Sequence, residues 1–184
     1  SGGLASYCLD GYFFTEDPTD AYLNGHQQKV PLLVGRNSLE MSPQAYLGGK
    51  APTLENLRPA LEAAFGDKTD EAMRLYGLNT DRDVLGKPGV DFASDQFIAY
   101  GTWLFGYLHA KTSGQPVYRY YFSHPRPAMR DKGLVAGLAG GVQKKDDGDV
   151  MTIPQNDVFK GAVHSADIEY AMATLPTNRV YDWQ

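Results

Sequence analysis

Two segments of the chain carry side chains suited to acid–base chemistry. Residues 30–40 (VPLLVGRNSLE) are a short apolar run that reaches Gly35 and is followed by the carboxylate of Glu40. Residues 161–170 (GAVHSADIEY) place His164 in a loop just before a short helical pattern. A histidine that acts as a general base needs a carboxylate on its other ring nitrogen, which fixes the tautomer and stabilises the imidazolium. Glu40 and His164 are therefore the candidate acid and base.

Each of the two residues also has a simpler interpretation. Glu40 could cap the segment that begins near Ser42 and Pro43, and His164 could be a core or capping histidine. An acid after a strand, followed later by a histidine, is nevertheless the chain order of acid and base in an α/β-hydrolase triad. The matching nucleophile motif is missing, because no serine here has glycine two residues before and two residues after it. The sequence thus predicts the acid and the base of a catalytic triad without its nucleophile.

The remaining candidate residues do not form a second site. His26, His109 and His124 lie at no metal-ligand spacing with one another or with Cys8, so the sequence predicts no catalytic metal. Cys8 lies in an apolar, tyrosine-flanked stretch that favours a packed thiol. The acidic run at residues 146–149 lacks EF-hand spacing and is expected to be a solvated turn.

Length and charge set limits on the function. A chain of 184 residues suits one core with a flanking subdomain, and the net charge of −5 with interspersed signs argues against a nucleic-acid partner. No apolar run approaches the roughly 18 residues needed to span a bilayer, so no membrane span is expected. No signal peptide is visible, and the composition leaves the compartment open.

Periodicity and turn residues predict an alternation of strands and helices. Residues 30–35 are expected to form a strand buried on both faces, and residues 117–122 a second strand rich in aromatic and β-branched side chains. Helices are expected at residues 54–65, from an N-cap at Thr69 to Gly77, and at residues 91–112, where an aromatic stripe is expected to lie in the core. Residues 78–90 are expected to be a turn-rich connector.

Residues 126–158 are rich in glycine, proline, lysine and aspartate and predict a loop or hairpin excursion. A turn at Asp147-Gly148 is expected to join segments 142–145 and 150–153. The glycine-rich run 133–141 has no following Lys-Ser/Thr, so it is expected to be a flexible loop and not a phosphate cradle.

Five segments, in order, resemble the C-terminal part of the type-B carboxylesterase family, which includes cholinesterases and bacterial p-nitrobenzyl esterases. Residues 9–13 (LDGYF) resemble its "V-D-G" segment, and residues 30–40 resemble "vPll-G-x-N-x-x-E". Asp95 with Phe97 resembles "D-x-x-F" at the start of a long helix, and residues 116–122 (PVYRYYF) resemble "P-v-Y-x-Y-x-F". Residues 161–170 resemble the histidine motif "G-A-x-H-x-x-E/D-l-x-y".

The resemblance covers nearly the whole chain and implies a single region, residues 1–184, from the C-terminal part of an α/β-hydrolase catalytic domain. It implies a few sheet strands with flanking helices, with Glu40 as triad acid and His164 as base of a serine esterase that needs no cofactor. The nucleophile and the oxyanion loop belong to the family's N-terminal half, so this chain alone is expected to be inactive. The chain also stops before the family's usual terminal helix, so both ends are expected to be truncated.

Three alternatives remain open at this point. A non-catalytic, cholinesterase-like binding domain would keep the fold and lose the triad, although the retained Glu40 and His164 argue against it. A free-standing chain would leave a sheet edge unpaired, and would be expected to associate with a missing N-terminal half or with a copy of itself. An unrelated α/β fold would lack a strand immediately before Glu40. In the complete enzyme the partner would be a small-molecule ester.

Overall fold

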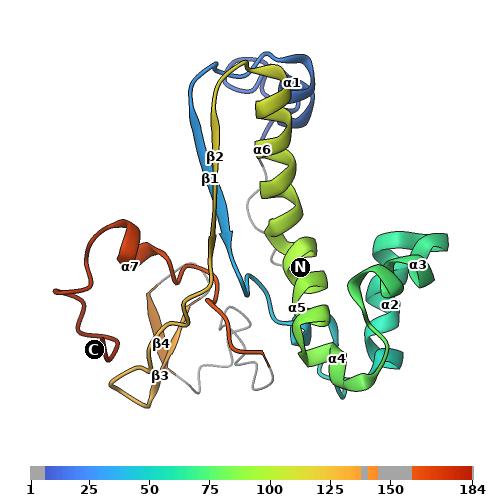
Figure 1. Cartoon of the computed structure of the whole chain (residues 1–184), viewed down its shortest axis with the longest axis vertical. Helices are drawn as coiled ribbons and strands as arrows, with labels where there is room; N and C mark the ends of the chain where they lie inside the picture. Colours follow the sequence, from blue (N-terminus) through green and yellow to red (C-terminus); the bar gives the residue numbers. More distant parts are fainter. Residues whose placement is uncertain (1–6, 138–140, 145–158, 184) are drawn as a thin grey trace. The chain divides into compact units, whose positions relative to one another are not determined.

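The computed structural model describes residues 7–137, 141–144 and 159–183, and the chain divides into two compact units. The first unit comprises residues 1–35 and 101–120, and the second comprises residues 36–100 and 121–184. Helices and strands both contribute, as expected for the α/β class (Figure 1).

Strands β1 (Leu32–Asn37) and β2 (Val117–Phe122) form a two-stranded sheet. The N–H of Leu32 donates to the carbonyl of Pro116 at one end of the pair, and the N–H of Ser38 donates to the carbonyl of Phe122 at the other. Both strands therefore run in the same direction, and the helices between them form the crossover that a parallel pair requires. The strand at 117–122 is confirmed, and the strand predicted at 30–35 lies two residues later.

The expected burial of the first strand on both faces is wrong for this chain. Leu33 is 69% exposed, and β1 is hydrogen-bonded to a single other strand among the described residues. A parallel strand is buried on both faces only when the sheet around it is wider and covered by helices.

In the first unit, helices α1 (Pro18–Asn24) and α6 (Tyr100–Thr112) accompany the strands. Asp17 caps α1 by accepting the N–H of Thr19. Helix α6 approaches the strands closely at Gly106, where an added Cβ would lie 3.0 Å from Cγ1 of Val34. His109 is buried on α6 and donates from Nε2 to the carbonyl of Val30 at 2.8 Å, so this histidine has a structural partner.

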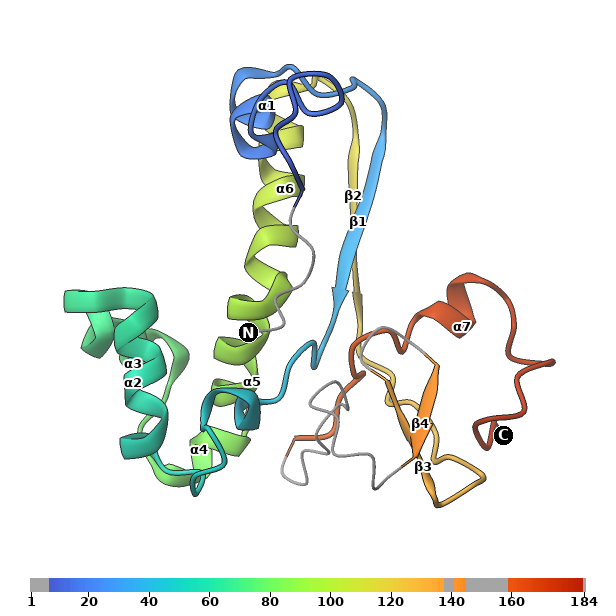
Figure 2. The same cartoon turned by 180° about the vertical axis from the view of Figure 1, so that it is seen from behind.

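In the second unit, an apolar core lies among four helices. Figure 2 shows the course of these helices. They are α2 (Leu54–Phe65), α3 (Thr69–Tyr76), α4 (Asp81–Leu85) and α5 (Lys87–Ser94). A 3₁₀ turn at Pro43–Tyr46 precedes them. The core consists of Leu47, Leu57, Leu61, Leu78, Val84 and Phe92.

The predicted helix at 54–65 is confirmed, with Thr53 accepting the N–H of Asn56 and Gly66 beyond its end. Thr69 is the first residue of α3 and not its N-cap, because a 3₁₀ turn at Gly66–Lys68 leads directly into the helix and the Thr69 hydroxyl donates to the carbonyl of Gly66. The connector expected at 78–90 is also wrong, since α4 and the start of α5 occupy it.

The helix expected at 91–112 begins earlier, at Lys87, and contains a π-helical turn at Asp95–Ala99 between α5 and α6. Phe92 is fully buried, whereas Trp103 is 47% and Phe105 is 36% exposed. The aromatic stripe is therefore not a continuous core element in this chain.

The C-terminal part of the second unit contains a small hairpin and a short helix. Strands β3 (Leu134–Ala136) and β4 (Val142–Lys144) pair antiparallel, so the glycine-rich run 133–141 includes a strand and is not wholly a loop. The turn predicted at Asp147-Gly148 and the acidic run 146–149 lie outside the described residues. Helix α7 (Ile168–Ala171) follows His164, as the pattern predicts.

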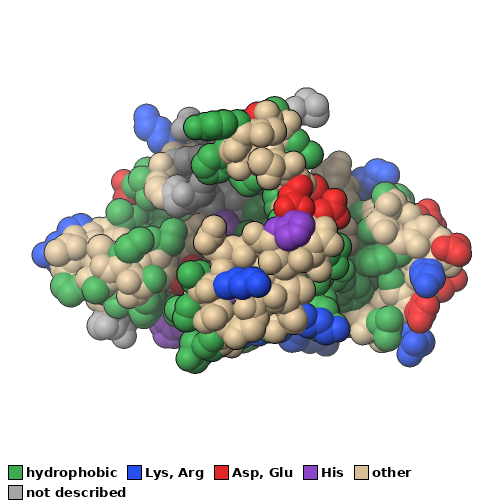
Figure 3. All heavy atoms as spheres, turned by 90° about the horizontal axis from the view of Figure 1, so that it is seen from above, with side chains coloured by type: hydrophobic (Ala, Val, Ile, Leu, Met, Phe, Trp, Pro, Cys, Tyr) green, Lys and Arg blue, Asp and Glu red, His purple; other side chains and the backbone are tan. Residues whose placement is uncertain are grey.

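Two surface features bear on the predictions from composition. Cys8 is exposed and free, so the packed thiol expected there is wrong. Lys and Arg side chains lie scattered among apolar and acidic ones on the face shown in Figure 3. Within the described part of the chain, no helix combines the length and the apolar character needed to cross a bilayer.

Candidate active site

Glu40 follows β1 by three residues and is held by its neighbours on both backbone and side chain. The N–H groups of Glu40 and Met41 donate to Oγ of Ser94, at 3.2 and 3.4 Å. The side-chain Oε1 accepts the N–H of Asn37 at 2.6 Å. Glu40 is only 5% exposed, and the bond from Asn37 compensates for part of the water that its carboxylate has lost. The second carboxylate oxygen, Oε2, remains available to a partner.

That partner is His164, whose Nδ1 lies 2.5 Å from Oε2 of Glu40. An ionised carboxylate only accepts hydrogen bonds, so Nδ1 carries the proton of this contact. In the neutral ring Nε2 then holds a free lone pair, which is the state a general base requires. Among the described residues, the ring is hydrogen-bonded through Nδ1 alone, and its side chain is 23% exposed. The two candidates that the sequence singled out thus lie together.

The histidine loop is attached directly to the end of β1. The N–H of Leu39 donates to the carbonyl of Ala162 at 2.8 Å, and the N–H of Ala162 donates to Oγ of Ser38 at 2.8 Å. Leu39 and Val163 form an isolated parallel bridge. Gly161 makes this approach possible, because a Cβ there would lie 2.6 Å from Oγ of Ser38. Gly161 of the histidine motif is therefore needed for the close packing of this loop against Ser38.

Asn37 connects the acid and histidine segments a second time. Its side-chain Nδ2 donates to the carbonyl of Val163 at 2.9 Å and to Oδ1 of Asp167 at 3.0 Å. Asn37 is 2% exposed, and its backbone N–H is the donor to Glu40 described above. One buried residue therefore contacts the acid, the residue before the histidine and the residue before α7.

An arginine supports the far side of the histidine loop. Arg126 donates to the carbonyl of Ser165 and forms an ion pair with Glu169 at 3.1 Å. Its guanidinium also lies 4.8 Å from the ring centre of Tyr181. Ser165 adopts φ = 67°, a left-handed conformation that is unfavourable for a residue with a side chain. The hydrogen bond to its carbonyl helps hold the backbone in that conformation.

The ring of Phe97, in the π-helical turn, covers one part of the imidazole. The two ring centres are 5.2 Å apart, and the planes meet at 77°, an edge-to-face contact. The π-helical turn therefore supplies an apolar side chain to the candidate base, while Ser94 at the end of α5 supplies the hydroxyl that holds the candidate acid.

The other histidines take no part in this arrangement. His26 pairs with Glu16 at 2.8 Å, His109 is buried on α6, and the ring of His124 contacts Tyr170. Within the part of the chain that the structure describes, no group of three or more His, Cys, Asp or Glu side chains is placed to hold a metal ion.

Residues Asn37, Ser94 and Arg126 were missed as candidates by the sequence analysis. Asn37 was within reach, because it belongs to the quoted motif and precedes Glu40 by three residues. Ser94 and Arg126 act over long separations in sequence, for which a single sequence carries no signal.

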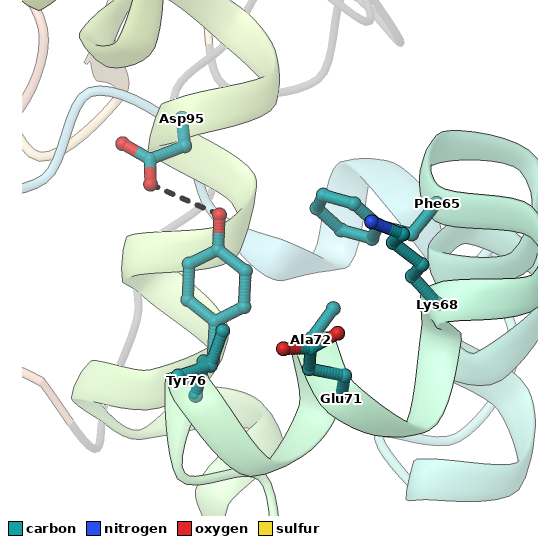
Figure 4. A pocket seen from close by; sticks show the side chains of 7 residues that line it. Phe65, Lys68, Glu71, Ala72, Tyr76 and Asp95 are labelled. Carbon is teal, nitrogen blue, oxygen red and sulfur yellow. Dashed lines mark hydrogen bonds between the residues drawn. The ribbon is translucent and has the colours of Figure 1, made fainter.

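An open pocket of about 430 Å³ lies elsewhere in the second unit (Figure 4). Its lining residues are Phe65, Lys68, Glu71, Ala72, Leu75, Tyr76 and Asp95. The hydroxyl of Tyr76 donates to Oδ2 of Asp95 at 3.0 Å. Burial raises the pKa of the Asp95 carboxyl above its ordinary value, and burial beside Asp95 likewise raises the pKa of Tyr76. Neither Glu40 nor His164 lines this pocket.

Comparison with known proteins finds one curated relative and one matching family model. A fumonisin B1 esterase from Sphingopyxis macrogoltabida is 34% identical over 116 residues, which are 62% of this chain and 21% of that protein. The chain thus spans about a fifth of the length of that relative. No solved structure matches. The family model for the carboxylesterase family matches residues 4–182. With nearly its whole length matched, the chain belongs to the carboxylesterase family.

Proposed function

We propose that this chain supplies the acid and the base of a serine carboxylesterase, with Glu40 as acid and His164 as base. The observation that carries the proposal is the 2.5 Å contact between Nδ1 of His164 and Oε2 of Glu40, at the end of a sheet strand. Membership in the carboxylesterase family supports ester hydrolysis as the chemistry. The partly exposed imidazole supports it as well, because a base must be reached by its substrate.

The proposed mechanism is acyl transfer through a serine that lies outside these 184 residues, since none of the serines here occurs in a Gly-x-Ser-x-Gly motif. That serine attacks the ester carbonyl, and Nε2 of His164 takes its proton. The carboxylate of Glu40 stabilises the imidazolium while the tetrahedral intermediate exists. His164 then gives the proton to the leaving alcohol. Water repeats the sequence to release the acid and restore the serine.

The proposed substrate is a carboxylic ester. The similarity to a fumonisin B1 esterase makes fumonisin B1 one reasonable ester to assay, beside simple p-nitrophenyl esters. Without a serine nucleophile from outside this chain, we expect the chain alone to hydrolyse none of them.

Fluorophosphonate labelling of the purified sample, with intact mass as the readout, tests the proposal. A label on a second polypeptide that co-purifies, and its loss in His164→Ala but not in the control His26→Ala, would support it. His26 is a suitable control because its ring pairs with Glu16 and lies outside the candidate site.

A label that persists unchanged in His164→Ala would refute the role of His164. If this chain is the sole polypeptide and no label is found, the chain is inert as isolated, as expected without a serine from outside it, and its function must be sought in the complete enzyme or in binding.

A further inference from the structure

Asn37 occupies a place in the candidate site that the proposed mechanism does not use. Its backbone N–H binds Oε1 of Glu40, and its side chain binds the segment that carries His164. Both contacts are buried or partly buried, and the residue itself is 2% exposed. We propose that Asn37 is a positioning residue that sets the geometry of the Glu40–His164 pair. This inference rests on the proposed function, since it concerns the same pair.

The contact with Glu40 determines which carboxylate oxygen faces the histidine. Because the Asn37 N–H occupies Oε1, the carboxylate is oriented with Oε2 toward His164. Backbone N–H groups lie at fixed positions, so this bond restricts rotation of the terminal carboxylate, which is otherwise broad. The two bonds to Ser94 fix the backbone of Glu40 and of Met41 in addition.

The contacts of the side chain determine where the histidine lies. Nδ2 has two protons, and each has an acceptor, the Val163 carbonyl on one side and Oδ1 of Asp167 on the other. These acceptors flank His164 in the sequence, so a single amide group holds the loop on both sides of the imidazole. Among amino acids with so short a side chain, asparagine alone carries a nitrogen with two hydrogen-bond donors.

The orientation of the amide follows from its neighbours. Oδ1 of Asn37 is buried without a partner among the described residues, whereas Nδ2 faces two oxygen acceptors. Exchange of the two atoms would place the amide oxygen against a carbonyl and a carboxylate, which is repulsive. The donor function of Nδ2 is therefore the property that the site requires.

The substitution Asn37→Asp isolates that property. It conserves the size of the side chain and the backbone N–H to Glu40, but it replaces the two Nδ2 donors by an acceptor. A carboxylate would then face the Val163 carbonyl and the Asp167 carboxylate. Asn24→Asp is the matched control, since it makes the same change of charge at an exposed position on α1.

The readout is the imidazole spectrum of the whole 184-residue chain, labelled with ¹⁵N in histidine. In the wild type we expect a downfield Nδ1 proton from His164 that His164→Ala and Glu40→Gln remove. His26 also faces a carboxylate, that of Glu16, through Nδ1, and the two histidines are told apart because a His26 signal survives both of these substitutions. Asn37→Asp should abolish or broaden this proton signal, and Asn24→Asp should leave it unchanged. A general loss of packing would change many signals and not this proton alone. The backbone amide spectrum of the rest of the chain is therefore recorded in parallel.

The outcomes separate the two claims. A wild-type spectrum without the signal, or a signal that survives Glu40→Gln, overturns the acid–base pair and with it the proposed function. A signal that depends on Glu40 but is unchanged in Asn37→Asp overturns the role of Asn37 alone. If Asn37→Asp fails to fold, the double variant Asn37→Asp/Asp167→Asn removes the carboxylate repulsion while still denying the Val163 carbonyl its donor. A wild-type signal in that variant likewise overturns the proposal.

Discussion

Ser94 offers a direct way to measure what supports the candidate acid. Its side chain is fully buried at the end of α5, and Oγ accepts the N–H groups of both Glu40 and Met41. In Ser94→Ala both groups lose their acceptor and a methyl group takes its place. Leaving a buried donor unsatisfied costs about 1–3 kcal/mol. The bonds are long, at 3.2 and 3.4 Å, and Met41 is only partly buried, so one such penalty and not two is expected.

Alanine also favours a helix over serine by about 0.5 kcal/mol, which offsets part of the loss. The net destabilisation of Ser94→Ala is therefore about 0.5–2.5 kcal/mol. With a urea dependence of roughly 2 kcal/mol per molar, the unfolding midpoint should fall by about 0.3–1.2 M. Urea titrations followed by circular dichroism measure this shift. The control is Ser123→Ala, which changes an exposed serine just after β2. Equal midpoints for the two variants would refute the reasoning that Ser94 holds the acid segment.

Three further predictions concern charge, the sheet edge and the glycine of the histidine motif. Burial raises the pKa of the Asp95 carboxyl above its ordinary value of 3.8, because the folded chain favours the neutral form. The stability that the neutral carboxyl contributes is full below pH 3.8 and is lost as the pH rises through the folded-state pKa. Asp95→Asn, which stays neutral, should therefore gain stability relative to the wild type between pH 4 and pH 7, and urea midpoints that change in parallel for both proteins would contradict this. Among the described residues β1 pairs with β2 alone, and its other edge should promote self-association. Leu33→Glu should weaken this association, whereas Leu75→Glu on α3, at the same exposure of 69%, should not. Light scattering across a concentration series measures the association, and a monomeric wild type would contradict the prediction. Gly161→Ala should lower stability because its Cβ would press on Oγ of Ser38, whereas Gly101→Ala, with open space around its Cβ, should raise stability by up to about 1 kcal/mol. Thermal unfolding measures the stability of both variants. Equal changes in the two would mean that the histidine loop can move to accommodate the added methyl group without loss of stability.

Local patterns were sufficient to predict several elements. The aromatic and β-branched run at 117–122 predicts β2 with its true bounds, because each residue favours an extended backbone. The spacing of apolar residues and the glycine stop at Gly66 predict α2 in the same way.

The interval 78–90 was misjudged for a physical reason. Gly86, Pro88 and Gly89 are turn-forming residues, and together they suggest a connector. In the structure Pro88 occupies the first turn of α5, where its missing N–H has no consequence. Gly89 allows close contact with α4, since a Cβ would lie 1.9 Å from the Val84 carbonyl oxygen. The same residues that interrupt one helix thus permit two short helices to pack closely.

The candidate site shows the same division between local and distant information. Glu40 and His164 became candidates through the family resemblance of their two segments, and their contact depends on the fold that brings these segments together. The supporting contacts of Ser94 and Arg126 depend on which loops meet in space. Exposed positions such as Leu33 and Trp103 were predicted to be buried because hydrophobic character alone does not say how much of a sheet or helix is covered.

The π-helical turn at Asp95–Ala99 makes the length of this segment as important as its composition. Each residue in a helix turns the chain by about 100°, so deleting one residue between Ser94 and Phe97 would carry the Phe97 ring away from His164. The bonds from Ser94 to the acid segment lie before the deletion and would be retained. A deletion at this point would therefore remove the shielding of the base and leave the support of the acid in place.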